Sequence, residues 1–218
     1  MSFDFTQAIK FTVVLLRGAV MTVEITACSL VVAIILGIFM AIIKTSRFRT
    51  ARFFVAVYIE IFRDVPALTM LFILYFGLAY VGIKIEPFPA AVIGLGLIGG
   101  AILTEVFRSG LDALHFGQKD AALAVGMTPM MAMRYIILPQ AIRITLPPVG
   151  NYAIGLLKDT AIVSAIAAPE IMFWARNLVT STFQTTLVYV LAAMIYFCMS
   201  FPLAQVVNKL EEKRRSWQ

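Results

Sequence analysis

Charged residues are scarce in this sequence, because Asp, Glu, Lys and Arg together make up only 14% of its 218 residues. A soluble domain carries about 25% charged and about 45–50% apolar residues, whereas 61% of this chain is hydrophobic. Its mean hydropathy is +0.92, and several apolar runs reach the length of about 20 residues that a bilayer-spanning helix needs. The composition therefore argues against a soluble domain and predicts an integral membrane protein.

Residues typical of catalytic and metal sites are also rare. His115 is the only histidine, with no cysteine or carboxylate pair nearby, so we interpret it as a solvated loop residue. Cys28 and Cys198 lie in separate apolar runs, where we expect buried, unreactive side chains. The sequence has no Gly-x-Ser-x-Gly motif for hydrolysis and no Gly-x-x-x-x-Gly-Lys-[Ser/Thr] loop to hold ATP phosphates. We therefore expect no enzyme activity, and no metal or cofactor bound by this chain.

The apolar runs predict an all-α fold with about five transmembrane helices in one membrane domain, residues 1–218. The expected spans cover residues 18–43, 53–81, 91–107, 136–157 and 186–207. The first run, preceded by mixed residues 1–17, is too long for a signal peptide and is expected to remain in the protein. Prolines, which break helices, are expected to interrupt the fourth run near its start at Pro139, Pro147 and Pro148.

Lys and Arg residues concentrate between and after the apolar runs, which is typical of topology signals rather than of a nucleic-acid site. Twelve lie in segments 44–52, 108–143 and 209–215, and four lie at Lys10, Arg17, Lys84 and Arg176. Because cytoplasmic loops are enriched in Lys and Arg, we expect the three segments to face the cytoplasm. With five spans, the C-terminus is then cytoplasmic and the N-terminus is outside.

The second apolar run is interrupted by Arg63-Asp64-Val65-Pro66. Pro66 lacks a backbone N–H and disfavours helix at the residue before it, so we expect a kink there. A charged pair at membrane depth is costly and therefore marks a candidate functional site. The alternative, a local Arg63–Asp64 pair with a purely structural role at the kink, stays equally open.

The third run contains Gly94-Leu95-Gly96-Leu97-Ile98-Gly99, a formal match to the dinucleotide-binding motif. That motif requires a strand before the glycines and a helix after them, whereas here it lies within an apolar membrane run. The small residues, including Gly96 and Gly100, instead predict a close approach between helices.

Residues 117–139 predict two short helices separated by a tight break on the cytoplasmic side. Asp120 is expected in the first turn of the first helix, where the helix dipole favours a negative charge. Gly126 suits the left-handed backbone that ends a helix, while Thr128 and Pro129 suit the start of the next one. Alanines raise helix propensity, and methionines add a flexible apolar surface. These residues are Ala121, Ala122, Ala124, Met127, Met130, Met131 and Met133.

This segment resembles the cytoplasmic loop of ABC-importer permeases, in which Glu-Ala-Ala is followed by Gly and, further on, by Ile-x-Leu-Pro. The matching residues are Asp120-Ala121-Ala122, Gly126 and Ile136-Ile137-Leu138-Pro139. Asp replaces Glu, a change that keeps the charge. The resemblance implies a short helix that docks on a separate ATPase. The implied coupling residues are Asp120, Ala121, Ala122, Gly126, Met127, Leu138 and Pro139.

Further stretches are similar to the polar amino-acid branch of this family, the histidine-, glutamine- and arginine-type permeases. They are Phe62-Arg63-x-x-Pro66, Tyr75–Leu78, Arg134–Arg143, Leu146–Asn151 and Leu156–Ser164. Two positions depart from the family pattern. Asp64-Val65 stand where Gly-Thr is common, and Tyr152 stands where an acidic residue often follows the asparagine. The missing acid weakens an assignment to a lysine- or arginine-type substrate.

The resemblance implies a permease subunit of an ATP-driven, binding-protein-dependent importer of polar amino acids or their derivatives, in a bacterial cytoplasmic (inner) membrane. The implied partners are two ATPase subunits that hold ATP and Mg, a second permease chain (identical or paralogous) and an extracytoplasmic amino-acid-binding protein. A zwitterion needs partners for both charges, for which the candidates are Asn151, Lys158, Asp159 and Thr160. Together with Arg63 and Asp64, these residues are the candidates for the solute path or its gate. Alternatively, Lys158 and Asp159 only pair with each other at a helix end. An ion-coupled secondary transporter or channel is the alternative function, although the internal repeats common in such proteins are not evident.

Overall fold

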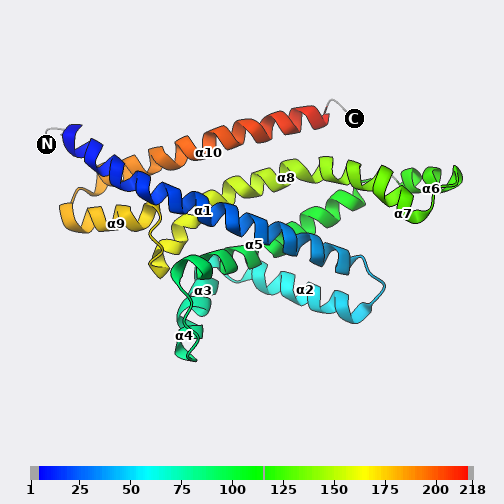
Figure 1. The fold of residues 1–218 in the computed structure, drawn as a ribbon, viewed down its shortest axis with the longest axis horizontal. Helices are drawn as coiled ribbons and strands as arrows, with labels where there is room; N and C mark the ends of the chain where they lie inside the picture. Colours follow the sequence, from blue (N-terminus) through cyan, green and yellow to red (C-terminus); the bar gives the residue numbers. More distant parts are fainter. Residues whose placement is uncertain (1–4, 115, 216–218) are drawn as a thin grey trace.

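The computed structural model describes residues 5–114 and 116–215, and the regular structure in these ranges is entirely helical. The elements are α1 (Phe5–Lys44), α2 (Arg49–Asp64), α3 (Ala67–Phe72), the π-helical turn η1 (Ile73–Gly77), α4 (Leu78–Tyr80), α5 (Pro87–Asp112), α6 (Phe116–Ala124), α7 (Pro129–Ala132), the π-helical turn η2 (Met133–Ile137), α8 (Leu138–Asp159), the 3-10 helix η3 (Thr160–Ile166), α9 (Ile171–Thr182) and α10 (Thr185–Arg215). The long helices α1, α5, α8 and α10 form an elongated bundle (Figure 1). The predicted all-α fold is confirmed.

Within the described ranges, three helices are long and apolar enough to cross a membrane, namely α1, α5 and α10. The number rises to four if α2 and the segment from α3 to α4 form one broken span. α8 is 22 residues long but carries Arg143, Lys158 and Asp159, and it is not one of these strongly apolar helices. Length and composition therefore identify fewer crossings than the five expected from the sequence.

α1 is 40 residues long and begins at Phe5, well before the expected start of the first span at Gly18. Ahead of the apolar run, Phe11 and Leu15 lie on a buried face of α1 and join a core cluster with α9 and α10. Tertiary packing rather than hydropathy stabilises this part of the helix. At 1.5 Å per residue the helix is about 60 Å long, which exceeds the thickness of a bilayer.

α1 and α5 approach closely at the glycines of the third apolar run. A Cβ at Gly96 would lie 2.6 Å from Val32 Cγ1, and a Cβ at Gly99 would lie 2.6 Å from Ala33 Cβ. The Gly99 position would also collide with the Tyr152 hydroxyl of α8, so Tyr152 fills the space that this glycine leaves. The glycines thus set the spacing of three helices, which confirms the helix-packing interpretation.

The chain turns by 105° between α2 and the segment from α3 to α4, which confirms the break expected at Pro66. Val65 has an extended backbone (φ −81°, ψ 129°), as the residue before a proline favours. Beyond it, α3 still packs against α5 and η3, with Leu71 in the core, and η1 and α4 extend from the bundle as a projecting arm (Figure 1). The single kinked span expected over residues 53–81 is therefore two segments that run in different directions.

Two other expectations were wrong. Pro147 and Pro148 lie inside α8 without ending it, because a packed membrane helix tolerates prolines when neighbouring groups satisfy the freed carbonyls. Cys28 and Cys198 are exposed on the surface of the chain, because the outward face of a membrane helix is as apolar as its inward face. The interpretation of His115 lies outside the described residues.

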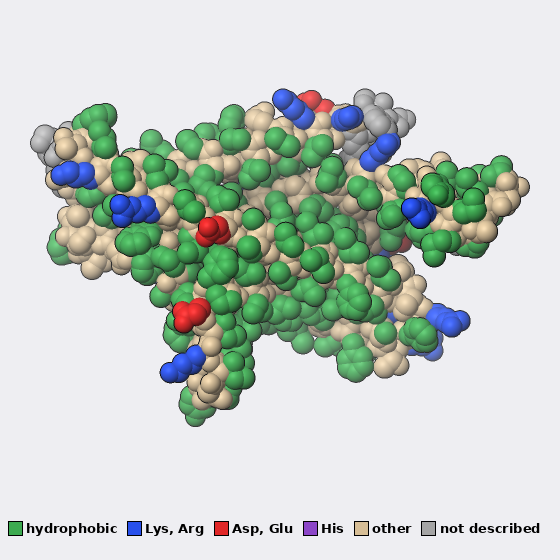
Figure 2. All heavy atoms as spheres, in the orientation of Figure 1, with side chains coloured by type: hydrophobic (Ala, Val, Ile, Leu, Met, Phe, Trp, Pro, Cys, Tyr) green, Lys and Arg blue, Asp and Glu red, His purple; other side chains and the backbone are tan. Residues whose placement is uncertain are grey.

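The three basic segments of the chain lie toward the same end of the bundle. The α1–α2 corner, the α6–α7 segment and the C-terminal end of α10 lie at the right in Figure 1, and Lys and Arg side chains mark these elements in Figure 2. The N-terminal end of α1 and the whole of α9 lie at the opposite end. The fold thus gathers the three segments that the charge distribution assigns to one side of the membrane.

Candidate coupling segment and solute path

Residues 116–132 fold as two short helices with a tight break, as the sequence predicts. Gly126 has φ +85°, in the left-handed region that glycine tolerates. The Gly126 N–H donates to Leu123 O (3.0 Å), and the Met127 N–H donates to Ala122 O (3.1 Å), which are the paired bonds of a Schellman motif. Among the described residues other than its chain neighbours, no atom lies within 4 Å of the Cβ position at Gly126, so a substitution there strains the backbone without a clash with these residues.

The second helix begins at Thr128, as predicted. The Thr128 hydroxyl accepts a hydrogen bond from the Met131 N–H (3.2 Å), and Pro129 occupies the first turn of α7. An N–H group that has no intrahelical partner is thereby satisfied.

From Pro129 to Asp159 the chain is continuously helical, because α7, η2 and α8 follow one another directly. Pro139 has no N–H to offer the carbonyl four residues back. Immediately before it, the Leu138 N–H donates instead to Met133 O, five residues back, so the helix widens by one residue and continues. Leu138 and Pro139, the first residues of α8, therefore continue the helix from α7 and η2 without a break.

Asp120 does not lie in the first turn of α6. This helix begins at Phe116, so Asp120 is its fifth residue, and the expected stabilisation by the helix dipole does not apply. Ala121 is exposed, whereas Ala122 is buried on the side of α6 that packs against the second helix. Only part of the alanine surface is thus open to a partner.

The outer surface of the segment is apolar. Its exposed large side chains are Leu123, Val125, Met130, Met131 and Met133, and Met127 is half-buried. The predicted methionine surface is therefore present. Val125, 77% exposed next to the break, was not singled out from the sequence, because a valine at the end of a short helix carries no distinctive pattern.

Arg63 and Asp64 lie at the end of α2, beside the 105° turn. The distance from Arg63 Nε to Asp64 Oδ1 is 3.8 Å, and the distance from Arg63 Nη2 to Glu60 Oε2 is also 3.8 Å. Each of these side chains is more than half exposed in the single chain. A local pair is thus present, but its length and exposure make it a weak one, and both charges remain open to another partner.

The four candidates on α8 and η3 differ in accessibility. Asn151, Lys158 and Asp159 are exposed, whereas Thr160 is fully buried and its hydroxyl donates to Leu157 O (2.7 Å). Within the described part of the chain no ion pair joins Lys158 to Asp159, so the alternative of a closed pair at the helix end is not observed. Arg63 and Asp64 lie on a different helix, at the end of α2.

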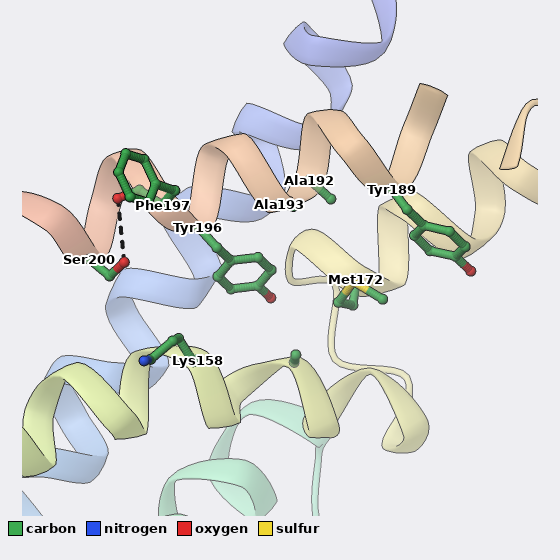
Figure 3. Close-up of a pocket in the computed structure, with 9 residues that line it drawn as sticks. Lys158, Met172, Tyr189, Ala192, Ala193, Tyr196, Phe197 and Ser200 are labelled. Carbon is green, nitrogen blue, oxygen red and sulfur yellow. Dashed lines mark hydrogen bonds between the residues drawn. The ribbon is translucent and has the colours of Figure 1, made fainter. Parts of the chain in front are cut away.

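Lys158 borders a groove of about 750 Å³ that opens between α8 and α10. In Figure 3, Tyr189 and Tyr196 project from α10 into this space, and Lys158 lies on the facing side. The remaining lining residues are Ala161, Met172, Ala192, Ala193, Phe197 and Ser200. The groove therefore combines one basic side chain with an aromatic and aliphatic wall.

Glu170 is a buried polar residue that the sequence interpretation missed. It is fully buried at the start of α9, where its carboxylate accepts hydrogen bonds from the Phe173 N–H and the Tyr196 hydroxyl, each 2.7 Å. The Trp174 indole donates to Pro169 O next to it (3.1 Å). A Pro-Glu pair directly before an apolar helix was the available signal, since a negative charge at a helix N-terminus is favourable.

An ion-pair network at the opposite end was also missed. Lys44, the last residue of α1, donates to Glu105 of α5, and Arg108 bonds both Glu105 (3.1 Å) and Asp112 (2.8 Å). The sequence interpretation treated Lys44 and Arg108 only as topology signals. In the structure they tie α1 to the last turns of α5, just before α6 begins.

Comparisons with known proteins identify relatives over almost the whole chain. The family model described as "Binding-protein-dependent transport system inner membrane component" matches residues 33–216. The probable amino-acid ABC transporter permease protein YckA of Bacillus subtilis is 34% identical, with 97% of this chain and 93% of YckA covered. The glutamine transport system permease protein GlnP of Escherichia coli is 29% identical, with 99% of each chain covered.

Solved structures agree with this. A chain from the "Crystal structure of an amino acid ABC transporter with histidines" superposes with a TM-score of 0.91 at 34% identity, covering 98% of this chain and 100% of that one. A chain from an inward-facing MetNI methionine ABC transporter superposes with a TM-score of 0.71 at 21% identity, covering 90% and 96%. The second match supports the fold alone.

Proposed function

We infer the function of this chain from the family to which it belongs, the binding-protein-dependent transport system inner membrane components. It is a transmembrane permease subunit of an ATP-driven importer of amino acids. The chain forms the translocation path and does not hydrolyse ATP, which is the task of a separate ATPase subunit. An ion-coupled transporter is not favoured by any feature of the structure.

The observation that carries the mechanism is the continuous helix from Pro129 to Asp159. At 1.5 Å per residue it extends roughly 45 Å, from the break at Gly126 to the candidate solute residues at its other end. When an ATPase moves the coupling segment, α8 transmits the movement to Lys158 and Asp159. The proposed contact with that ATPase is made by Asp120, Ala121, Val125 and the exposed methionines.

The proposed membrane topology has five crossings in one domain, with the N-terminus outside and the C-terminus in the cytoplasm of a bacterial inner membrane. The gathering of the basic segments at one end supports this orientation. In this arrangement α8 is the fourth crossing. Its polar side chains are compatible with a helix that faces protein or a water-filled path rather than lipid.

The proposed solute path runs along α8. In a low-dielectric site an unpaired charge is unfavourable, so both ends of a zwitterionic amino acid need a partner. We assign the carboxylate to Lys158 and the ammonium group to Asp159, with Asn151 as a hydrogen-bonding neighbour and the Arg63–Asp64 pair as a second polar position. Thr160, whose hydroxyl is already bonded within the chain, has a structural role beside them.

The proposed assembly contains two ATPase subunits with ATP and Mg, a second permease chain and an extracytoplasmic amino-acid-binding protein. The test is to reconstitute these components and to measure ATP hydrolysis with each amino acid in turn. Stimulation that requires the binding protein and one class of amino acid supports the proposal and identifies the substrate. Solute uptake by the permease chain alone, driven by an ion gradient, would overturn it.

Gly126→Val tests the coupling segment and has a matched control. Gly126 (φ +85°) and Gly82 (φ +90°) both have left-handed backbones and open space at the Cβ position, so a valine adds about 1–2 kcal/mol of backbone strain at either site. Gly126→Val should release the ATPase subunit or abolish stimulated hydrolysis, whereas Gly82→Val, in the turn between α4 and α5, should retain both. Equal behaviour of the two variants contradicts the docking role.

A further inference from the structure

The corner between α1 and α2 carries an unbalanced group of arginines. Arg47, Arg49 and Arg52 are exposed, and in the ranges 5–114 and 116–215 no acidic side chain pairs with them. The nearby Lys44 is different, because it is already paired with Glu105. The corner therefore presents three guanidinium groups without a counter-charge from this chain.

Exposed aromatic side chains alternate with these arginines. Phe48, Phe53 and Phe54 are 63%, 65% and 66% exposed, and the Arg47 guanidinium lies 5.5 Å from the centre of the Phe48 ring. The Phe53 and Phe54 rings contact each other edge to face at 5.9 Å. Large aromatic groups open to the surroundings beside basic ones are typical of the membrane–water interface.

The apolar surface continues along α1 directly next to this corner. The exposed side chains of its last two turns are Ile38, Phe39 and Ile42. Hydrophobic side chains therefore adjoin the basic side chains at this corner (Figure 2). A ligand that fits has an anionic head and an apolar tail.

The N-terminus of α2 adds to the positive potential of the corner arginines. Phe48 is its N-cap and provides no side-chain hydrogen bond to the first turn, so N–H groups of this turn remain available at the positive end of the helix dipole. An anion placed there by the arginines would therefore gain additional donors.

We propose that the α1–α2 corner binds the phosphodiester headgroup of an anionic phospholipid. Arg47, Arg49 and Arg52 contact the phosphate, for which the forked guanidinium is well shaped, while Phe48, Phe53 and Phe54 lie against the acyl chains. The proposal rests on the proposed membrane function, which places this corner at the cytoplasmic leaflet. A lipid fits better than the ATPase, because the exposed aromatic side chains are followed by the exposed apolar side chains of the last two turns of α1.

The test compares three variants of the full-length chain, purified in detergent and transferred to nanodiscs of phosphatidylcholine and phosphatidylglycerol. The corner variant carries R47Q, R49Q and R52Q. The control carries K10Q, R17Q and K84Q, which removes the same charge from other parts of the surface. A third variant carries R47K, R49K and R52K, which keeps the charge but removes the forked donors. Mass spectrometry then measures the ratio of the two lipids retained after partial delipidation.

The wild-type chain and the control should retain phosphatidylglycerol selectively. Each basic residue near an anionic surface contributes about fivefold, so the corner variant should lose selectivity by on the order of 100-fold. The lysine variant should lose part of this selectivity. Because it keeps the positive charge, it still tests the role of the guanidinium groups if the glutamine variant does not fold. Equal losses in the corner and control variants, or no loss in either, would overturn the site.

Two further arms identify the source of the anion. Inorganic phosphate added to the wild-type nanodiscs should not displace phosphatidylglycerol. Displacement of the bound lipid by phosphate would indicate a site for a free anion and would overturn the proposal. Loss of the ATPase subunit from the corner variant in detergent, with lipid selectivity unchanged, would make the corner a protein interface instead. If no ATPase binds the wild-type chain while lipid selectivity persists, the proposed function fails and the lipid site stands.

Discussion

Gly18 lies where α1 crosses the start of α9, and its replacement by alanine should destabilise the bundle. A Cβ at this position would lie 2.7 Å from the Glu170 carbonyl carbon and 2.8 Å from both Glu170 O and Ile171 N. All three are backbone atoms. The Phe173 N–H and the Tyr196 hydroxyl hold the Glu170 side chain at 2.7 Å each, so this backbone has little freedom to move away.

The size of the effect follows from comparison with Gly155→Ala. Gly155 is a helical glycine in α8 with no atom within 4 Å of its Cβ position. Alanine raises helix propensity by about 1 kcal/mol at either site, which cancels in the comparison. Forcing atoms into a packed site costs about 1–3 kcal/mol, and the upper part of that range applies at Gly18 because the obstacle is backbone. In a chain of this length 1 kcal/mol corresponds to roughly 2–4 °C, so the two midpoints should differ by about 5–10 °C.

The assay is thermal unfolding of both variants in one detergent, followed by circular dichroism. Gly155→Ala should unfold at or slightly above the wild-type temperature, and Gly18→Ala should unfold well below it. Equal midpoints would refute the argument, because they would mean that the junction of α1 and α9 yields to an added methyl group. A Gly18→Ser variant, of similar size but polar, should resemble Gly18→Ala.

Two further substitutions test the buried polar contacts. Tyr196→Phe removes the hydroxyl donor from the buried Glu170 carboxylate, which should lower the free energy of unfolding by about 1–3 kcal/mol; an unchanged midpoint in the same thermal assay would mean that the carboxylate finds another donor. Lys44→Met breaks the partly buried pair with Glu105 and should destabilise the junction of α1 and α5 by on the order of 1 kcal/mol. A double-mutant cycle with Glu105→Gln measures the coupling, and additive effects would contradict it.

The break between α6 and α7 was predictable in detail. Gly126, Thr128 and Pro129 act on backbone groups within four residues of themselves, and the break at Pro66 follows from the ring of a single residue. Interactions of such short range leave their pattern in the sequence. For the same reason, the family motif was recognisable from one short stretch of the chain.

The position of Asp120 in its helix could not be predicted from the neighbouring residues. Its place in α6 depends on how far the helix extends toward α5, and no residue before it marks the start. Similarly, Phe11 and Leu15 extend α1 well ahead of the apolar run, because α9 and α10 cover their face. Helix length in both cases depends on contacts that local propensity does not encode.

Hydropathy and local pattern thus determine that this chain is helical, lies in a membrane and carries two short helices with a tight break between two long helices. Only the tertiary structure decides which apolar faces are inside. It exposes Cys28 and Cys198 and buries Thr160 and Glu170. Within the described residues it also places no acidic side chain in an ion pair with the corner arginines. The physical reason is that lipid is as apolar as the core of the bundle. The inward and outward faces of a span therefore look alike in sequence until distant segments are brought together.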